Sequence, residues 1–150
     1  IRLFEGVHAG TLLAVVGGRH VCVVDKVVEP VAPSAPVVGS ELLDVVQDGE
    51  RLLATLPDRN EVVVLRRRSF ELLRRLHVPG GPSRLTRTAD GSHWLVGMRD
   101  GGGYARIDAR SLDVEVRRFA LPGNETGFNR VLPLRDGRLL LLSAFGGRFA

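Results

Sequence analysis

The sequence predicts an all-β protein built from repeated four-stranded antiparallel sheets, and three observations lead to that prediction. An Asp-Gly pair recurs at residues 48–49, 90–91 and 136–137, with a weaker Ala-Gly copy at 9–10, so that successive copies begin 39, 42 and 46 residues apart. Short apolar runs of strand length flank these pairs. A second cluster of turn residues then follows in each repeat. A period of about 40–45 residues is typical of the blade of a β-propeller.

Each repeat contains predicted strands in one order, from an inner to an outer position. The Asp-Gly pair joins the first two strands, because glycine accepts the positive φ that a tight hairpin turn requires. First strands are predicted at residues 42–46, 84–88 and 130–134; second strands at 11–16, 51–55, 93–97 and 138–143; third strands at 21–25, 61–65 and 104–108; outer strands near Val27 and at 71–78 and 113–121.

Longer loops that contain proline separate the repeats, at residues 30–39, 79–83 and 122–129. Proline cannot donate a hydrogen bond to a sheet ladder, so these loops are expected to divide one sheet from the next. The chain is therefore predicted to be a single partial domain, a β-propeller fragment of about three and a half four-stranded antiparallel blades. The predicted blades cover residues 1–39, 40–82 and 83–128, and residues 129–150 form the first half of a fourth. Trp94 is expected to pack between blades.

Two segments also resemble the capped start of a helix. They are residues 40–43 (SELL) and 69–73 (SFELL), where a serine precedes leucines at helical spacing. Their place in the repeat favours strands instead, because the equivalent segments 113–116 (DVEV) and 130–132 (RVL) alternate or carry β-branched residues.

Several segments of the third repeat resemble one repeat of the streptogramin B (virginiamycin B) lyase-like propellers. They are residues 81–86 (GPSRLT), 90–96 (DGSHWLV), 105–108 (ARID) and 119–122 (FALP). Residues 60–65 (NEVVVL) and 78–82 (VPGGP) of the preceding repeat look equally like the YVTN repeat propellers. The resemblance covers nearly the whole chain and is specific for blade architecture, whereas propellers of similar blades host many functions.

The resemblance implies a closed ring of about seven blades. We therefore expect this chain to be a fragment of a protein of about twice its length, whose missing blades would be partners of the exposed sheets. The lyase-like enzymes hold a magnesium ion with histidine and glutamate on the ligand face. Glu125 and His20 are the only residues of those types in the predicted face loops, and they belong to different blades. The resemblance assigns no catalytic residue in this chain and does not identify its cofactor.

In such propellers the ligand face is built by the loops that lead into the innermost strands and by the turns between the second and third strands. The residues predicted to form that face are Arg59, Asn60, Arg99, Asp100, Asn124, Glu125 and Asn129, with Ser83, Thr126, His20, Asp58 and Arg148 in the same loops. The loop at 122–129 is the longest polar one and carries a carboxylate, two amides and an aromatic ring. The Asp-Gly turns are short and are expected to offer a ligand little.

Several kinds of site are not indicated by the sequence. None of the four histidines, His8, His20, His77 and His93, has another histidine or a cysteine within three to five residues, so no zinc motif is spelled out. His93 is expected to point to the opposite side of the pleat from Ser92 and Trp94. Cys22 is the only cysteine, which excludes an intrachain disulfide.

Charge and hydropathy limit the class of partner. The chain has 20 arginines, one lysine and a net charge of +4, but the only run of basic residues is 66–68, so nucleic-acid binding is not predicted. No apolar run approaches the ~20 residues of a membrane helix, and a soluble protein is expected. The cellular location is left unknown.

The favoured interpretation is a non-catalytic β-propeller that presents a binding face to a protein or a small ligand. The alternative is a metal-dependent lyase or lactone-opening enzyme of the streptogramin B lyase-like type, with a divalent metal such as magnesium near the central channel. Catalysis would require acid, base or metal ligands that converge on the inner rim.

Overall fold

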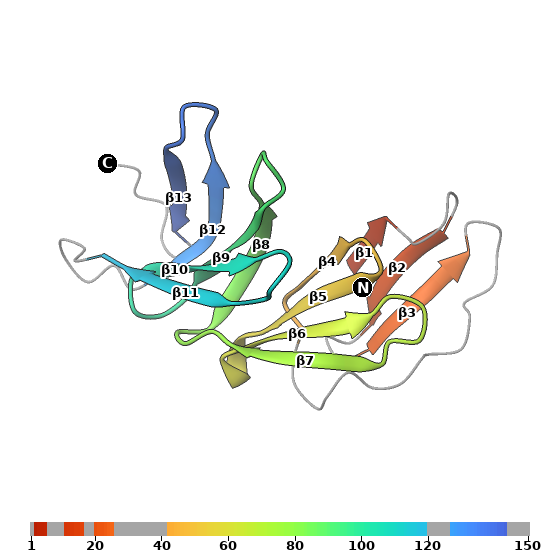
Figure 1. Cartoon of the computed structure of the whole chain (residues 1–150). Helices are drawn as coiled ribbons and strands as arrows, with labels where there is room; N and C mark the ends of the chain where they lie inside the picture. Colours follow the sequence, from red (N-terminus) through yellow and green to blue (C-terminus); the bar gives the residue numbers. More distant parts are fainter. Residues whose placement is uncertain (1, 6–10, 17–19, 26–41, 120–126, 144–150) are drawn as a thin grey trace.

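The computed structural model describes residues 2–5, 11–16, 20–25, 42–119 and 127–143. These residues form antiparallel sheets arranged around a common axis, as in a partial β-propeller (Figure 1). The first sheet contains β1 (Arg2–Glu5), β2 (Thr11–Val16) and β3 (His20–Asp25). The second contains β4 (Asp44–Asp48), β5 (Arg51–Leu56), β6 (Glu61–Arg66) and β7 (Leu72–His77). The third contains β8 (Pro82–Arg87), β9 (His93–Met98), β10 (Gly103–Asp108) and β11 (Val114–Arg118). The fourth pairs β12 (Phe128–Pro133) with β13 (Leu139–Ser143).

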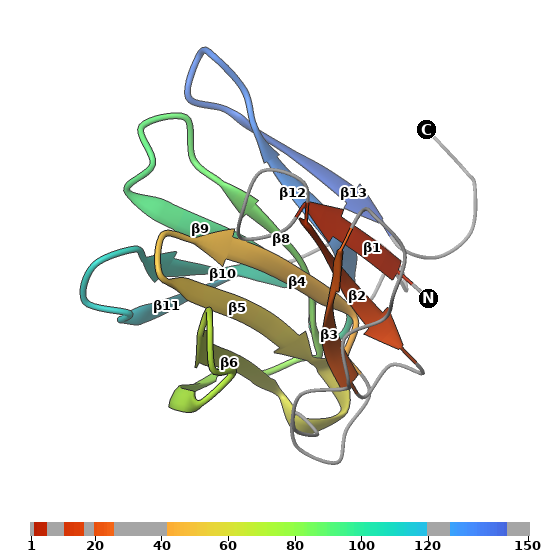
Figure 2. The same ribbon diagram turned by 90° about the vertical axis from the view of Figure 1, so that its right-hand side faces the viewer.

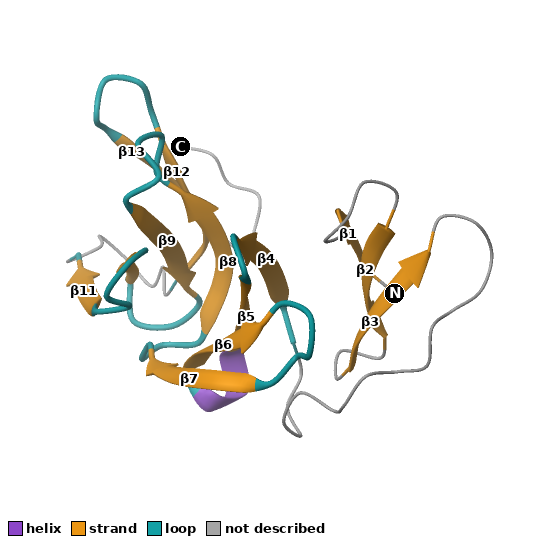
Figure 3. Ribbon diagram, turned by 45° about the vertical axis from the view of Figure 1, so that its right-hand side comes forward, coloured by secondary structure: helices purple, strands orange, loops and turns teal. Residues whose placement is uncertain are grey.

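The strand order of the second and third sheets is β4-β5-β6-β7 and β8-β9-β10-β11, so each strand pairs with its neighbour in sequence. The all-β prediction and the partial propeller are thereby confirmed. The outer strand expected near Val27 lies outside the described residues. Residues 69–78 form no helix: β7 occupies most of this segment, and the short 3-10 helix at Pro57–Arg59 is the one helical element in the part of the chain that the structure describes (Figure 3).

The inner strands begin at other positions than the sequence predicted. β4 begins at Asp44 and not at residue 42, whereas β8 begins at Pro82 and β12 at Phe128, each two residues earlier than expected. The reason is a bulge in both later strands. The register of β8 against β9 shifts between Pro82 and Leu85, and that of β12 against β13 shifts between Phe128 and Arg130. A bulge inserts an extra residue into one strand, and the alternation of apolar residues in the sequence does not predict where this happens.

The three Asp-Gly turns lie on one side of the sheets, as Figure 2 shows for the turns β4–β5, β8–β9 and β12–β13. Gly49, Gly91 and Gly137 have φ values of 60°, 70° and 82°. This left-handed conformation is the one that glycine adopts without a Cβ clash. The hairpins predicted from the repeat are therefore confirmed.

The main core fills the space between the second and third sheets. Leu53, Val62 and Val64 of the second sheet pack there with Trp94 and Ile107 of the third. A second apolar cluster lies on the other face of the second sheet and contains Leu52, Ala54, Leu56, Val63 and Leu65. Because both faces of β5 and β6 are covered, these strands read as almost continuous apolar runs and not as alternating ones. The placement of Trp94 between blades is confirmed.

Polar side chains also tie neighbouring inner strands together. The Asp44 carboxylate, which is buried, accepts a hydrogen bond of 2.9 Å from the backbone N–H of Leu85 in the next sheet. The buried hydroxyl of Ser83 donates to the carbonyl oxygen of Phe128, and it also contacts Asn129. These contacts satisfy groups near the two bulges, and buried backbone groups need such partners.

Candidate functional site

The predicted ligand face is assembled around the loop that leads into β8. Asn60 ends the Pro57–Arg59 turn with a φ of 55°, and its side-chain oxygen accepts a hydrogen bond of 2.8 Å from the N–H of Gly81. The backbone N–H groups of Arg99 and Asp100 donate to the carbonyl oxygens of Gly81 and Gly80, at 3.0 and 2.8 Å. The structure therefore brings Asn60, Arg99 and Asp100 to one loop.

This loop leaves no room for larger residues. A Cβ atom added at Gly80 would lie 2.2 Å from the carbonyl oxygen of Asp100, and Gly80 has a φ of 86°. Only glycine combines that backbone conformation with so close an approach. The β9–β10 turn is thereby held rigidly against the loop at Gly80 and Gly81.

The other predicted face residues are placed differently. Asn129 is half-buried in β12, with its side-chain oxygen 3.4 Å from the Ser83 hydroxyl, so it belongs to the junction of β8 and β12. His20 is the first residue of β3. Asn124, Glu125, Thr126 and Arg148 lie outside the described residues. The use of this face by a ligand stays a prediction.

Four charged side chains on this face have no partner in the described part of the chain. Asp58, Arg59 and Asp100 are exposed and Arg99 is half-buried. None of their side-chain atoms makes a hydrogen bond or ion pair among the described residues. They come from the β5–β6 and β9–β10 turns of successive blades. Two cationic and two anionic groups are therefore available to a binding partner.

The opposite face carries a cavity that the sequence did not indicate. It has a volume of about 600 Å³, lies where the second sheet meets the third, and is lined by Asp48, Arg51, Arg87, Asp90, Gly91, Ser92, Asp108, Ala109 and Arg110. A second cavity of about 260 Å³ lies beside it and is lined by His93, Arg106, Asp108, Ser111, Asp113, Val114 and Glu115. The expectation that the Asp-Gly side offers a ligand little stays a prediction, although the β10–β11 turn adds its own polar groups to those of the β8–β9 turn at this cavity.

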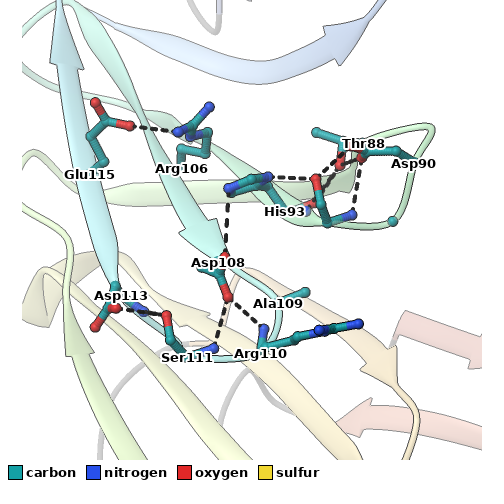
Figure 4. Close-up of polar contacts among 12 residues, drawn as sticks. Thr88, Asp90, His93, Arg106, Asp108, Ala109, Arg110, Ser111, Asp113 and Glu115 are labelled. Carbon is teal, nitrogen blue, oxygen red and sulfur yellow. Dashed lines mark hydrogen bonds and ion pairs between the residues drawn. The ribbon is translucent and has the colours of Figure 1, made fainter.

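A polar network connects these two turns (Figure 4). The Ser92 hydroxyl lies 2.7 Å from an oxygen of Asp90 and 2.6 Å from Nδ1 of His93. Nε2 of His93 lies 3.8 Å from an oxygen of Asp108. The expectation that His93 and Ser92 point to opposite sides is wrong: β9 begins at His93, so Ser92 belongs to the turn, where strand alternation does not apply.

Two carboxylates of this network are held ionised by their hydrogen bonds. The hydroxyl of Thr88, followed by the hydroxyl and backbone N–H of Ser92, holds the pKa of Asp90 far below its ordinary value of 3.8. The backbone N–H groups of Ser111 and Arg110 lower the pKa of Asp108. Donors that bind a carboxylate stabilise its charged form.

These lowered pKa values predict acid sensitivity. A carboxylate whose pKa is lower in the folded state contributes stability above its unfolded pKa, and that contribution is lost as the pH falls toward the folded pKa. The urea midpoint of the full-length protein should therefore decrease when the pH is lowered below about 5. Asp90→Asn should reduce this decrease, whereas Asp58→Asn, at a carboxylate without a partner, should leave it unchanged. An equal response in both variants would contradict the assignment to Asp90.

Two further findings concern membrane-spanning helices and metal-binding groups. Within the described ranges no helix is long and apolar enough to cross a membrane. Nor do the described residues contain a group of three or more histidine, cysteine, aspartate or glutamate side chains that could hold a metal ion.

Comparison with known proteins gives no sequence family but a clear fold. No protein-family model matches the chain, and no curated protein sequence matches it. Among solved structures, a catalytically inactive variant of virginiamycin B lyase from Staphylococcus aureus with quinupristin is similar with a TM-score of 0.72 and 10% identity, over 94% of this chain and 48% of the lyase. Hydrazine synthase from Kuenenia stuttgartiensis is similar with a TM-score of 0.69 and 21% identity, over 97% of this chain and 42% of that one. Dihydro-heme d1 dehydrogenase is similar with a TM-score of 0.67 and 18% identity, over 93% of this chain and 32% of that one.

These likenesses establish the β-propeller fold, including its similarity to virginiamycin B lyase. The chain spans less than half the length of each of these three proteins. Their different activities agree with the general rule that function belongs to sites and not to the fold.

Proposed function

We propose that this chain is part of a β-propeller that binds a protein or small ligand without catalysis, on the face where the loops lead into the inner strands. The observation that carries the proposal is that the charged side chains of Asp58, Arg59, Arg99 and Asp100 make no hydrogen bond or ion pair among the described residues. Asn124 and Glu125, which precede β12, and Asn129, which lies in β12, are included in the proposed face.

The backbone that carries these charged side chains is held by hydrogen bonds, which favours ligand binding. Gly80 and Gly81 are hydrogen-bonded to Asn60, Arg99 and Asp100, so the two turns are fixed relative to each other. A rigid surface loses less conformational freedom when a ligand binds. Because both signs of charge are present, the arrangement suits a partner with charges of both signs, such as a peptide segment or a protein surface.

The carboxylates of Asp58 and Asp100, which have no partner among the described residues, also distinguish this face from the opposite one. On the Asp-Gly side the carboxylates of Asp48, Asp90 and Asp136 already accept hydrogen bonds or ion pairs from their neighbours. Groups that are already satisfied gain little from a ligand. Charged groups that only water solvates are free to form specific contacts.

The test uses the full-length protein and substitutions at two of the charges. Ligands found for the wild type, by thermal shift against small molecules and by binding to an immobilised peptide library, should bind the Arg59→Ala, Arg99→Ala double variant at least about tenfold more weakly. The melting temperature should change little, because these side chains make no hydrogen bond or ion pair among the described residues. Arg135→Ala, at an exposed arginine of the β12–β13 turn, is the matched control and should bind normally. Unchanged affinity in the double variant would contradict the proposal.

The enzyme alternative predicts a different result for the full-length protein. Its magnesium ion is implied only by the resemblance to the lyase-like propellers, and the described residues include no group of three or more ligands that would fit it. No catalytic step is therefore assigned to them. If the full-length protein opened a cyclic lactone such as quinupristin, the ligand in the lyase structure, and lost that turnover with a chelator, the non-catalytic proposal would be wrong.

Further blades of the same polypeptide are the partners that we propose for the fourth sheet. The side chains of Leu134 and Leu140 are 40% and 45% exposed there, and the chain covers only 48% and 42% of two similar solved structures. A blade packed on β12 and β13 would bury such apolar side chains, as the second and third sheets bury theirs.

A further inference from the structure

The larger cavity of the Asp-Gly side has the size of a small-molecule site. Its volume of about 600 Å³ lies within the usual range for ligand pockets. It is formed by two blades: Asp48 and Arg51 come from the second sheet, and the remaining lining residues come from the third. Arg51 crosses this junction, because its Nη2 atom contacts both Asp48 and the carbonyl oxygen of Ala109.

The acidic groups of the cavity have their acceptor oxygens occupied. The side chain of Asp48 is only 5% exposed and forms ion pairs with Arg51, at 2.5 Å, and with Arg87, at 3.3 Å. Asp90 accepts hydrogen bonds from Thr88 and Ser92. Asp108 accepts from the backbone N–H groups of Arg110 and Ser111. A cation entering the cavity would have to compete with these donors.

The arginines, in contrast, have donors left over. Arg87 is fixed by its hydrogen bonds to the carbonyl oxygen of Gly91 and by its position 5.3 Å over the ring of Trp94. Arg51 uses only Nη2 in the contacts above. The exposed guanidinium of Arg110 makes no hydrogen bond or ion pair within the described part of the chain, and Figure 4 shows it extending away from Asp108.

We infer that this cavity binds an oxyanion, a carboxylate or phosphate group of a small ligand, with Arg110 as its principal donor. Guanidinium groups match the oxygens of carboxylate and phosphate with paired hydrogen bonds, and the donors that Arg51 and Arg110 leave unused among the described residues are available to such oxygens. Arg51 and Arg87, which both form ion pairs with Asp48, line the cavity together with Arg110. The formal charges of the lining residues balance, so the selectivity comes from donor placement and not from a general positive field.

The experiment measures the binding of two simple oxyanions to the full-length protein. Inorganic phosphate and succinate are titrated separately by isothermal calorimetry at constant ionic strength, with the wild type, Arg110→Gln and Arg110→Lys. At least one anion should bind the wild type, and Arg110→Gln should weaken it about tenfold or more, since a charge-assisted paired contact is lost. Arg110→Lys keeps the positive charge but not the paired donors of the guanidinium group, so it should weaken anion binding less.

A matched control separates the site from general electrostatics. Arg135→Gln removes the same charge from another exposed arginine on the Asp-Gly side, which has no partner among the described residues and does not line the cavity. This variant should bind as the wild type does. The Arg59→Ala, Arg99→Ala variant of the other face should also bind the anion normally, which keeps this inference independent of the proposed function. Binding of phosphate alone, or of succinate alone, would identify which group the site selects.

Two results would overturn the inference. The first is that neither anion binds the wild type at concentrations where surface arginines already attract phosphate. The second is that Arg110→Gln and Arg135→Gln weaken binding equally, because the effect would then be one of net charge and not of the cavity.

Discussion

Replacing Trp94 with alanine should lower the free energy of unfolding by about 4 kcal/mol. The Trp94 side chain is 5% exposed and belongs to the core cluster between the second and third sheets, with Val62, Val64 and Ile107. Alanine would leave a cavity at this junction and would remove the ring on which the Arg87 guanidinium lies. The blades could close such a gap only by moving against each other, which the surrounding strands resist.

Trp94→Phe should cost much less, about 1–2 kcal/mol. The indole Nε1 atom is buried and has no hydrogen-bond partner, so its loss breaks no hydrogen bond. Both variants should be measured by urea unfolding of the full-length protein, followed by far-UV circular dichroism, because Trp94 is the only tryptophan in this sequence. A loss below about 1 kcal/mol for Trp94→Ala would show that the two sheets do not depend on this contact.

Replacing Gly97 with alanine should destabilise the protein by about 3 kcal/mol. A Cβ atom at this position would lie 2.5 Å from the carbonyl oxygen of Phe128 and 3.0 Å from the backbone of Asn129. Both neighbours are backbone atoms of β12, so a rotamer change cannot relieve the clash. The added methyl group would push the fourth sheet away from β9, and glycine in a strand interior often marks such a close approach.

Gly49→Asn is the control for this substitution. Gly49 has no atom within 4 Å of an added Cβ, and asparagine tolerates its positive φ of 60°. Urea unfolding should therefore show little change for this variant. If Gly97→Ala were as stable as Gly49→Asn, the close approach of β12 to β9 would not exist in solution.

Much of the fold was predictable because its signals are local. The Asp-Gly pairs locate the hairpin turns through the conformational freedom of Gly49, Gly91 and Gly137, and the strands follow from apolar runs of the right length. The segment at 69–73 shows the limit of such signals. Its helical spacing of leucines was outweighed by the repeat, and β7 begins at Leu72 because its residues pair with β6.

The candidate sites were less predictable because they depend on contacts between blades. The sequence indicated that Asn60, Arg99 and Asp100 would share a face, since the repeat places their turns on one side. It could not indicate that the side chain of Asn60 accepts a hydrogen bond from Gly81, while those of Arg99 and Asp100 make no hydrogen bond or ion pair among the described residues. It also gave no sign that Ser92 and His93 contact each other, because Ser92 lies in the turn before β9, where the alternation of strand side chains does not apply.

By itself, then, the sequence determined the repeated sheets, their turns and the burial of Trp94, because turn chemistry and apolar spacing act between residues close in the chain. The tertiary structure alone decided which charges are paired and where a cavity forms. Arg51 reaches the carbonyl oxygen of Ala109, 58 residues away, and Asp44 accepts from Leu85, 41 residues away. Such contacts depend on how one blade is set against the next. An arginine that has no partner among the described residues, such as Arg110, can be recognised only once those distances are known.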